Sequence, residues 1–214
     1  KMFDTLTIDR TVVIGEGELD EAPMLYIGER IGKAVEGSPE LDIAVDPLDG
    51  TTSVAKGLSN AISVVAVAPK GCLLHAPDMY MMKIAVGPKA KGCVDINASV
   101  EENLMNVANA LNKAISDITV TILDRPRHKE LIDSVRKVGA RIKLFSDGDV
   151  AAAIATCFDH SGVDVLMGIG GAPEGVLAAA ALKCLEGELQ AKLSPMTDEQ
   201  RRRCMEMVPD VEKV

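Results

Sequence analysis

The stretch ITVTILDRPRHKELIDSVRKVGARIKLF, residues 118–145, sets the fold class of this chain. Residues 119–123 are β-branched or apolar and predict a strand, whereas residues 128–138 carry apolar side chains at helical spacing. Gly139 marks the end of that helix, and residues 141–145 predict a second strand. A strand, a helix and a strand in succession predict parallel strands with a helix packed on one face of their sheet.

The same alternation continues toward the C-terminus. Residues 149–157 and 174–186 predict helices, and residues 163–167 predict the strand between them. Repeated strand–helix units favour a parallel or mixed sheet with helices on its faces. We therefore predict an α/β protein in which two α/β layers share a cleft.

The first part of the chain is richer in predicted strands. Short β-branched runs predict strands at residues 11–14, 42–45 and 62–67. The last run precedes a Pro-Lys-Gly turn and resumes at residues 72–74, which predicts a hairpin. Apolar residues at helical spacing predict helices at residues 21–35 and 101–112.

These patterns divide the chain into three parts. The β-rich half covers residues 1–112 and holds two acidic motifs, and the α/β half covers residues 113–190. Residues 191–214 become strongly charged, and they predict a helical or partly ordered tail.

Composition excludes several classes of protein. The formal net charge of −9 argues against a general nucleic-acid surface. No apolar run approaches the roughly 20 residues that a membrane span requires, which argues against a membrane partner. The five cysteines are scattered without a CxxC pair, which indicates reduced thiols and a cytoplasmic location.

Acidic residues follow the predicted strands. Ligands of open α/β sheets collect at the carboxyl ends of strands, so these acids are expected to share one pocket. They are Glu16, Glu18, Asp20, Asp46, Asp49 and Glu174. Crowded carboxylates repel one another and lose hydration, and a hard divalent cation relieves both effects. An all-oxygen set suits Mg²⁺ or Mn²⁺ better than zinc, and the three histidines lack metal-ligand spacing.

Some of these acids have an ordinary structural alternative. Asp20 and Asp149 are equally well explained as solvated turn residues or helix caps. The segments Gly15–Glu18 and Asp46–Thr51 are different, because two acidic motifs that each follow a strand favour the metal site over a pair of turns.

Longer motifs resemble a known family. The sequence DPLDGT at residues 46–51 resembles the signature of the lithium-sensitive, metal-dependent phosphatases. Together with residues 15–26, 76–81 and 168–175, it resembles the class II (GlpX-type) fructose-1,6-bisphosphatases, and the resemblance extends from about residue 11 to residue 187.

The resemblance implies a fold and an activity. It implies a layered α-β-α-β-α sandwich that hydrolyses the 1-phosphate of fructose 1,6-bisphosphate to give fructose 6-phosphate, in gluconeogenesis or glycerol metabolism. It also implies Mn²⁺ or Mg²⁺ as cofactor and a homodimer or homotetramer. A sedoheptulose-1,7-bisphosphatase or dual-specificity enzyme is the main alternative, and a sugar-phosphate sensor without enzymatic activity is another.

The resemblance also assigns roles to residues. The metal ligands implied are Glu16, Asp46, Asp49 and Glu174, although many members of this branch carry Glu at the position of Asp49. The substrate contacts implied are Asp49, Gly50, Thr51, Tyr80, Arg125, Pro126, Arg127, Asp147, Gly148 and Asp149.

The DPLDGT motif suits phosphoryl transfer. Asp46 is held where a strand ends, Pro47 turns the chain away, and Asp49 returns a second carboxylate toward the same ions. Gly50 lets the backbone approach a phosphate closely. We assign Thr51, with Glu16 or Asp20 as the base, to orient and deprotonate the attacking water.

The remaining contacts each have a competing interpretation. Arg125 and Arg127 can bind the phosphate that does not react, or they can be surface cations on a turn. Asp147 and Asp149 can accept hydrogen bonds from sugar hydroxyls or cap a helix. Tyr80 can reach the substrate through its hydroxyl or be an ordinary residue at the edge of the core. His128 is interpreted as the start of a helix and not as a catalytic base.

Family members carry further elements that have no match here. Helices upstream supply another metal-binding Asp and a Lys near the reacting phosphate, and nothing between Lys1 and Arg10 matches them. The family also continues beyond the region of Val208. We therefore expect this sequence to lack segments on both sides, of which the upstream one carries part of the site, and we expect the chain alone to bind divalent ions weakly.

Overall fold

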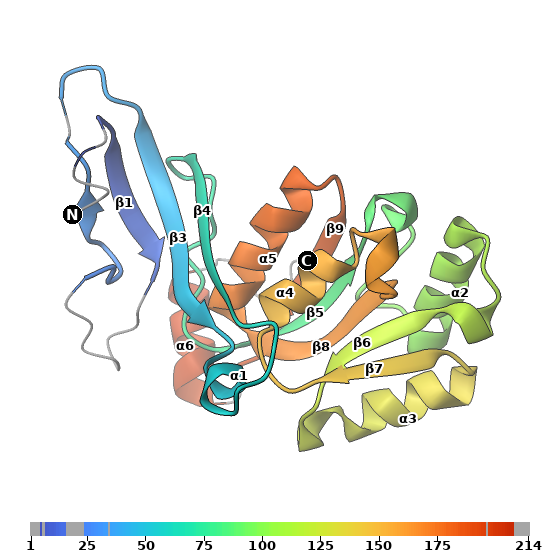
Figure 1. The fold of residues 1–214 in the computed structure, drawn as a ribbon. Coiled ribbons are helices and arrows are strands. Elements are labelled where there is room, and N and C mark those ends of the chain that lie inside the picture. Colours follow the sequence, from blue (N-terminus) through green and yellow to red (C-terminus); the bar gives the residue numbers. More distant parts are fainter. Residues whose placement is uncertain (1–4, 6, 16–23, 34, 196, 208–214) are drawn as a thin grey trace.

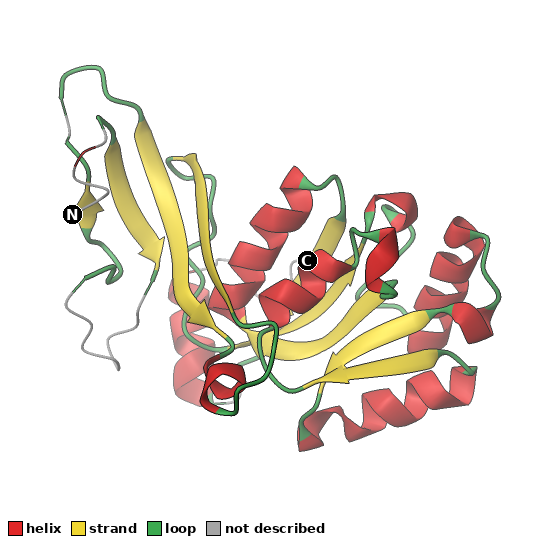
Figure 2. Ribbon diagram, viewed as in Figure 1, coloured by secondary structure: helices red, strands yellow, loops and turns green. Residues whose placement is uncertain are grey.

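The computed structural model describes residues 5, 7–15, 24–33, 35–195 and 197–207, and these residues form two mixed sheets and several helices (Figures 1 and 2). The first sheet has the strand order β2-β1-β3-β4. Its strands are β1 (Asp9–Ile14), β2 (Arg30–Ile31), β3 (Glu40–Asp49) and β4 (Ile62–Pro69). The second has the order β7-β6-β8-β5-β9. Its strands are β5 (Tyr80–Val86), β6 (Thr119–Leu123), β7 (Arg141–Phe145), β8 (Val165–Gly171) and β9 (Glu188–Leu193).

The helices lie in layers around these sheets. They are α1 (Thr51–Ala55), α2 (Val100–Leu111), α3 (Lys129–Val138), α4 (Asp149–Ala155), α5 (Ala172–Cys184) and α6 (Asp198–Met207). Figure 1 shows α4 and α5 between the two sheets, with α2 and α3 on the other face of the five-stranded sheet. The α/β class is thus confirmed. The part of the chain that the structure describes forms the alternating layers sheet, helices, sheet, helices.

Helix α5 joins the two sheets because it is apolar on all sides. Leu177 packs in one core with Val13 of β1, and Leu182 packs in another with Leu166 of β8. A helix of that composition is stable only when it is buried on both sides. The first turn of α5 is therefore held firmly at the junction of the two sheets.

The strand–helix alternation predicted downstream of residue 118 is confirmed. Strand β6 pairs in parallel with both β7 and β8. Helix α3 ends at Gly139, whose φ of +94° is readily adopted by glycine. The core on this side is built from aliphatic side chains, among them Leu104, Ile122 and Val135.

Two local predictions are wrong. Within the expected helix at residues 21–35, the described residues 24–33 are not helical, and β2 pairs there with β1. Gly28 and Gly32 adopt φ of +90° and +103°, which interrupts any helix. The hairpin is also wrong, because β4 pairs antiparallel with β3 and residues 72–74 form no strand.

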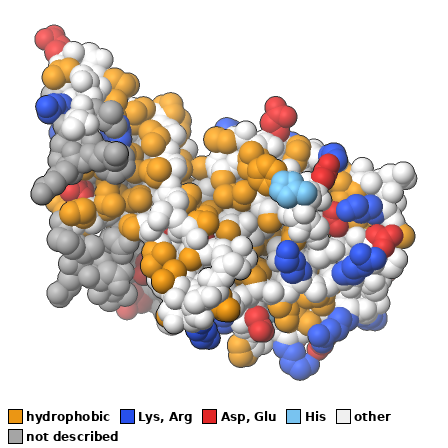
Figure 3. Space-filling model, in the orientation of Figure 1, with side chains coloured by type: hydrophobic (Ala, Val, Ile, Leu, Met, Phe, Trp, Pro, Cys, Tyr) orange, Lys and Arg blue, Asp and Glu red, His pale blue; other side chains and the backbone are white. Residues whose placement is uncertain are grey.

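The two sides of the molecule differ in surface character. About half of Val65 and of Val67 on β4 is exposed. Figure 3 shows hydrophobic side chains over the first sheet and Lys and Arg side chains gathered over the opposite end of the molecule. None of the described helices combines the length and the apolar character of a membrane span.

Candidate active site

Strand β3 ends in an irregular segment that carries two carboxylates. The register between β3 and β4 shifts between Asp46 and Asp49, around Pro47, which cannot donate a ladder hydrogen bond. Oδ1 of Asp46 accepts a hydrogen bond from the Leu48 amide at 2.9 Å. The shift turns the chain so that Asp49 becomes buried, with 5% of its surface exposed.

Gly50 makes the turn that follows. Its φ is +95°, and a Cβ at this position would lie 3.2 Å from Cα of Ala61. Both the backbone conformation and the close approach favour glycine. Thr51 comes next as the first residue of α1 and is exposed.

Two more carboxylates come from the first turns of the central helices. Asp149 begins α4, and Glu174 lies in the first turn of α5. Two glycines of β8 make room for them. A Cβ on Gly170 would lie 2.1 Å from Oδ2 of Asp149, and a Cβ on Gly171 would lie 1.9 Å from Oε2 of Glu174.

Burial and neighbouring charges raise the pKa values of Asp46, Asp49 and Glu174. Burial, followed by the charges of Asp149, Asp46 and Glu174, raises the pKa of Asp49 to about 7, although a hydrogen bond from the Val150 amide acts in the opposite direction. Burial, followed by the charge of Asp149, also raises the pKa of Glu174. The pKa of Asp46 is raised, chiefly by burial, despite the Leu48 hydrogen bond. The four carboxylates therefore form one electrostatic group.

Three oxygens of this group are buried and have no hydrogen-bond partner among the residues that the structure describes. They are Oδ2 of Asp49, Oδ1 of Asp149 and Oε2 of Glu174. Buried carboxylate oxygens are unstable without a donor or a cation, so their chemistry fits a hard divalent ion. Among the described residues, however, no three acidic, His or Cys side chains are already arranged around a single ion position.

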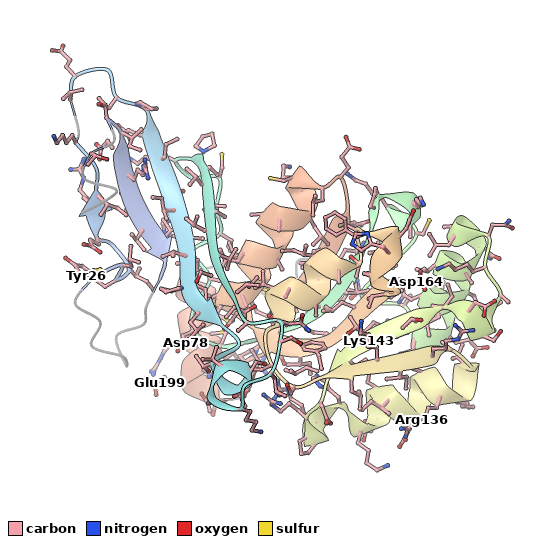
Figure 4. The ribbon with its side chains drawn as sticks, viewed as in Figure 1. Tyr26, Asp78, Arg136, Lys143, Asp164 and Glu199 are labelled. Atoms are coloured by element: carbon pink, nitrogen blue, oxygen red, sulfur yellow. The ribbon has the colours of Figure 1, made fainter. Side chains whose placement is uncertain are left out.

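A pocket of about 410 Å³ opens over the end of β3. Acidic side chains from several elements line it: Asp46, Asp49, Asp78, Asp147 and Glu174. Gly50 and Thr51 line the same pocket. Asp78 was not among the predicted site residues, although it lies in the motif at residues 76–81. Figure 4 shows Asp78 near the end of β3 and α1.

A buried lysine provides positive charge beside the acids. Lys83 of β5 is 3% exposed, and its ammonium donates to Oδ2 of Asp149 at 2.6 Å. Its charge lowers the pKa of Glu174, opposing the effect of burial. Lys83 was not predicted as a site residue because β5 was not predicted from the sequence. The available signal was one charged residue within the apolar run YMMKIAV.

The two predicted phosphate-binding arginines lie in different surroundings. Arg125 donates through one terminal nitrogen to the backbone oxygen of Ser146 at 2.7 Å, and its other terminal nitrogen lies 3.7 Å from Oδ1 of Asp147. The guanidinium of Arg127 lies over the ring of Tyr80, 4.7 Å from its centroid. Arg127 and Tyr80 are therefore brought together, whereas Arg125 is associated with Asp147.

Of the remaining predicted residues, Asp147 lines the pocket and Gly148 lies close to Asp49. Oδ2 of Asp147 accepts a hydrogen bond from the Thr52 amide at 2.8 Å, which ties the loop after β7 to α1. Gly148 has a φ of +79°, and a Cβ there would lie 3.4 Å from Oδ2 of Asp49. Pro126 begins a 3₁₀ turn, Pro126–His128, between β6 and α3. The predicted Glu16 and Asp20 lie outside the described residues.

Carboxylates gathered at one pocket are the oxygen donors that hold divalent cations in metal-dependent phosphatases. The chain belongs to the family described as bacterial fructose-1,6-bisphosphatase, glpX-encoded, whose family model matches residues 1–214. This match confirms the resemblance inferred from the sequence motifs.

Similar proteins carry names of the same kind. The chain is 54% identical over 192 residues to fructose-1,6-bisphosphatase 1 class 2 of Escherichia coli strain K12. Fructose-1,6-bisphosphatase class 2 of E. coli O6:H1 (strain CFT073) and that of Shigella flexneri show the same identity over the same length. Each match covers 90% of this chain and 56% of the relative. The chain thus spans about half the length of the curated relatives it matches.

Proposed function

We propose that this chain takes part in the metal-dependent hydrolysis of the 1-phosphate of fructose 1,6-bisphosphate, which yields fructose 6-phosphate and phosphate. The observation that carries the proposal is the pair of buried oxygens on Asp49 and Glu174, two pocket-lining acids, which have no hydrogen-bond partner among the described residues. Family membership and the names of the similar proteins support this substrate. They do not favour sedoheptulose 1,7-bisphosphate or a sensor.

Asp46, Asp49 and Glu174 would hold Mn²⁺ or Mg²⁺, with Glu16 as a further ligand. When bound, such a cation supplies Lewis-acid activation of the phosphate and a water of lowered pKa. The chain's own contribution is to fix the carboxylates. Asp46 is restrained by the Leu48 amide, and Glu174 by the buried start of α5.

Thr51 would orient the attacking water. It lies at the pocket directly after Gly50, whose conformation brings the backbone to this position. Glu16 or Asp20 would accept the proton. Because the leaving group is the C1 oxygen of the sugar, the water must approach the phosphorus from the opposite side.

The sugar and the second phosphate would contact the rim. Arg127 and Tyr80 would bind the phosphate that is not cleaved, since their stacking presents a guanidinium and a hydroxyl together. Asp149 would accept a hydrogen bond from a sugar hydroxyl through Oδ1, which has no partner among the described residues. Asp147, Gly148, Arg125 and Pro126 complete the proposed contacts.

The location and assembly belong to the same proposal. All five cysteines are free thiols, which supports a cytoplasmic location. A homodimer or homotetramer is proposed from the family resemblance.

A substrate panel tests the function. Phosphate release would be measured with fructose 1,6-bisphosphate, sedoheptulose 1,7-bisphosphate and inositol 1-phosphate, each with Mn²⁺, Mg²⁺ or EDTA. We expect release that needs a divalent ion and is fastest with the fructose ester. Mn²⁺ binding by calorimetry provides a readout besides activity. Release that persists in EDTA would contradict the metal assignment, and a faster sedoheptulose reaction would contradict the substrate.

A further inference from the structure

His128 lies between β6 and β8, and both of its ring nitrogens are engaged. The residue is 1% exposed. Nδ1 lies 2.6 Å from the backbone oxygen of Leu123, and Nε2 lies 2.8 Å from the backbone nitrogen of Ile169. A backbone N–H can only donate, so Nε2 must accept. The ring proton is therefore on Nδ1, where it donates to Leu123.

The surroundings keep this imidazole neutral. Burial is the largest influence and lowers the pKa of His128, and the charges of Arg127 and Arg125 lower it further. The hydrogen bond with Leu123 acts in the opposite direction. A second proton would place an N–H of the ring against the N–H of Ile169, so protonation would break this contact.

Ile169 connects His128 to Arg127. The backbone oxygen of Ile169 accepts from Nε of Arg127 at 3.1 Å and from its terminal nitrogen at 2.7 Å. The ring of His128 can come this close to the strand because Gly168 has no side chain. A Cβ there would lie 3.1 Å from Nε2, and the φ of Gly168 is +151°.

We propose that His128 is a positioning residue. It holds the backbone of Ile169 in the position from which the backbone oxygen of Ile169 keeps the guanidinium of Arg127 over Tyr80. The inference rests on the proposed function where it assigns the second phosphate to Arg127. His128 itself is not among the residues that line the acidic pocket. Its effect on the reaction passes through Ile169 and Arg127 alone.

Two substitutions at His128 separate the effects of the two hydrogen bonds that its ring makes. The amide nitrogen of Asn can replace Nδ1, so His128→Asn keeps the contact with Leu123 and leaves the Ile169 amide without an acceptor. The longer His128→Gln can place its amide oxygen near the position of Nε2 and keep the Ile169 contact. His160 is exposed, and His160→Asn is the matched control.

Kinetics measure the consequence for Arg127. We expect His128→Asn to raise KM for fructose 1,6-bisphosphate about tenfold, the loss expected for one misplaced charged hydrogen bond. kcat should change less, and KM for the monoester p-nitrophenyl phosphate should change least. His128→Gln should recover most of the affinity. In an Arg127→Ala background, His128→Asn should add less than about a twofold change, because the two residues act on the same contact.

Nuclear magnetic resonance of the unaltered chain tests the geometry without any substrate. Nitrogen shifts should show a neutral His128 with its proton on Nδ1. The Nε proton of Arg127 should exchange slowly in the unaltered chain and in His128→Gln, and faster in His128→Asn.

The outcomes separate the two proposals. A proton on Nε2, unchanged Arg127 exchange in His128→Asn, or equal losses on both substrates would overturn the positioning role. A different result is that Arg127 exchange is slow and depends on His128, but the chain does not discriminate the bisphosphate from the monoester. That result would support the positioning of Arg127 and overturn the assignment of the second phosphate to it.

Discussion

The ammonium of Lys83 lies 2.6 Å from Oδ2 of Asp149, with 2% and 12% of the two side chains exposed. The pair joins the middle of β5 to the first turn of α4. The negative charge of Asp149 repels the carboxylates of Asp49 and Glu174. The ammonium of Lys83 offsets part of the negative charge of these acids. A buried ion pair of this kind depends on both partners, because either charge alone is poorly solvated.

Removing this cation should destabilise the chain. We expect Lys83→Met to lower the free energy of unfolding by roughly 3 kcal/mol, because it leaves Asp149 buried without its partner. Urea denaturation measures the change. The double variant Lys83→Met/Asp149→Asn should recover most of it. Lys89→Met breaks an exposed pair with Asp159 and should change stability by less than about 1 kcal/mol. Equal effects of the two single variants would contradict the role of burial.

The stability of the metal-free chain should depend on the protonation of Asp49. Its carboxyl has a pKa of about 7 in the folded chain, whereas the ordinary pKa of an aspartate side chain is 3.8. The folded state therefore binds more protons between these values, and stability is lost as pH rises through this window. We expect the free energy of unfolding, measured in EDTA, to fall between about pH 4 and pH 7. Asp49→Asn should make that slope shallower, and the raised pKa values of Asp46 and Glu174 account for the slope that remains. Parallel slopes in the two chains would argue against a raised pKa.

Two conservative substitutions test the metal ligands. Asp46→Asn and Glu174→Gln each remove an anionic oxygen and keep the side-chain volume. We expect both to abolish metal-dependent phosphate release and to weaken Mn²⁺ binding, with an unchanged circular dichroism spectrum. Asp159→Asn, on the exposed surface, is the control. Near-normal turnover of either variant at saturating Mn²⁺ would show that the assignment is wrong.

The two arginines should respond differently to truncation. Arg127→Ala should raise KM for the bisphosphate by roughly ten- to a hundredfold, which corresponds to about 1.5–3 kcal/mol for a charged hydrogen bond. The loss with a monophosphate ester should be smaller. Arg125→Ala should mainly lower stability, because Arg125 donates to the backbone oxygens of Asp124 and Ser146. Arg136 on α3, labelled in Figure 4, is the exposed control. Equal losses on both substrates would indicate a structural role for Arg127.

The fold was predictable where local patterns decide it. Helix α3 and strand β6 have clear periodicity and a glycine stop, so their types follow from neighbouring residues. Strand β4 was found, but its partner was not, because pairing with β3 depends on residues about twenty positions away. The non-helical segment around Gly28 was missed because its apolar spacing imitates a helix, and the backbone of two glycines overrides that spacing.

The site was predictable only as a set of residue types. DPLDGT identifies the acids of β3, yet sequence gives no measure of how deeply Asp49 is buried. Lys83 was missed because β5 was not predicted. The bond between His128 and Ile169 depends on where β6 and β8 end relative to each other, and no local pattern in the sequence reports that alignment.

Gly170 and Gly171 would stand out in a survey of all single substitutions. Even alanine at either position would overlap a carboxylate oxygen, of Asp149 in one case and of Glu174 in the other. Neither glycine has a side chain that could bind an ion or a sugar. A loss of function on substitution would therefore reflect the space that each glycine leaves for the neighbouring carboxylate. Engineering of this pocket therefore has to keep both positions unoccupied, and new contacts have to be introduced from the loops around it.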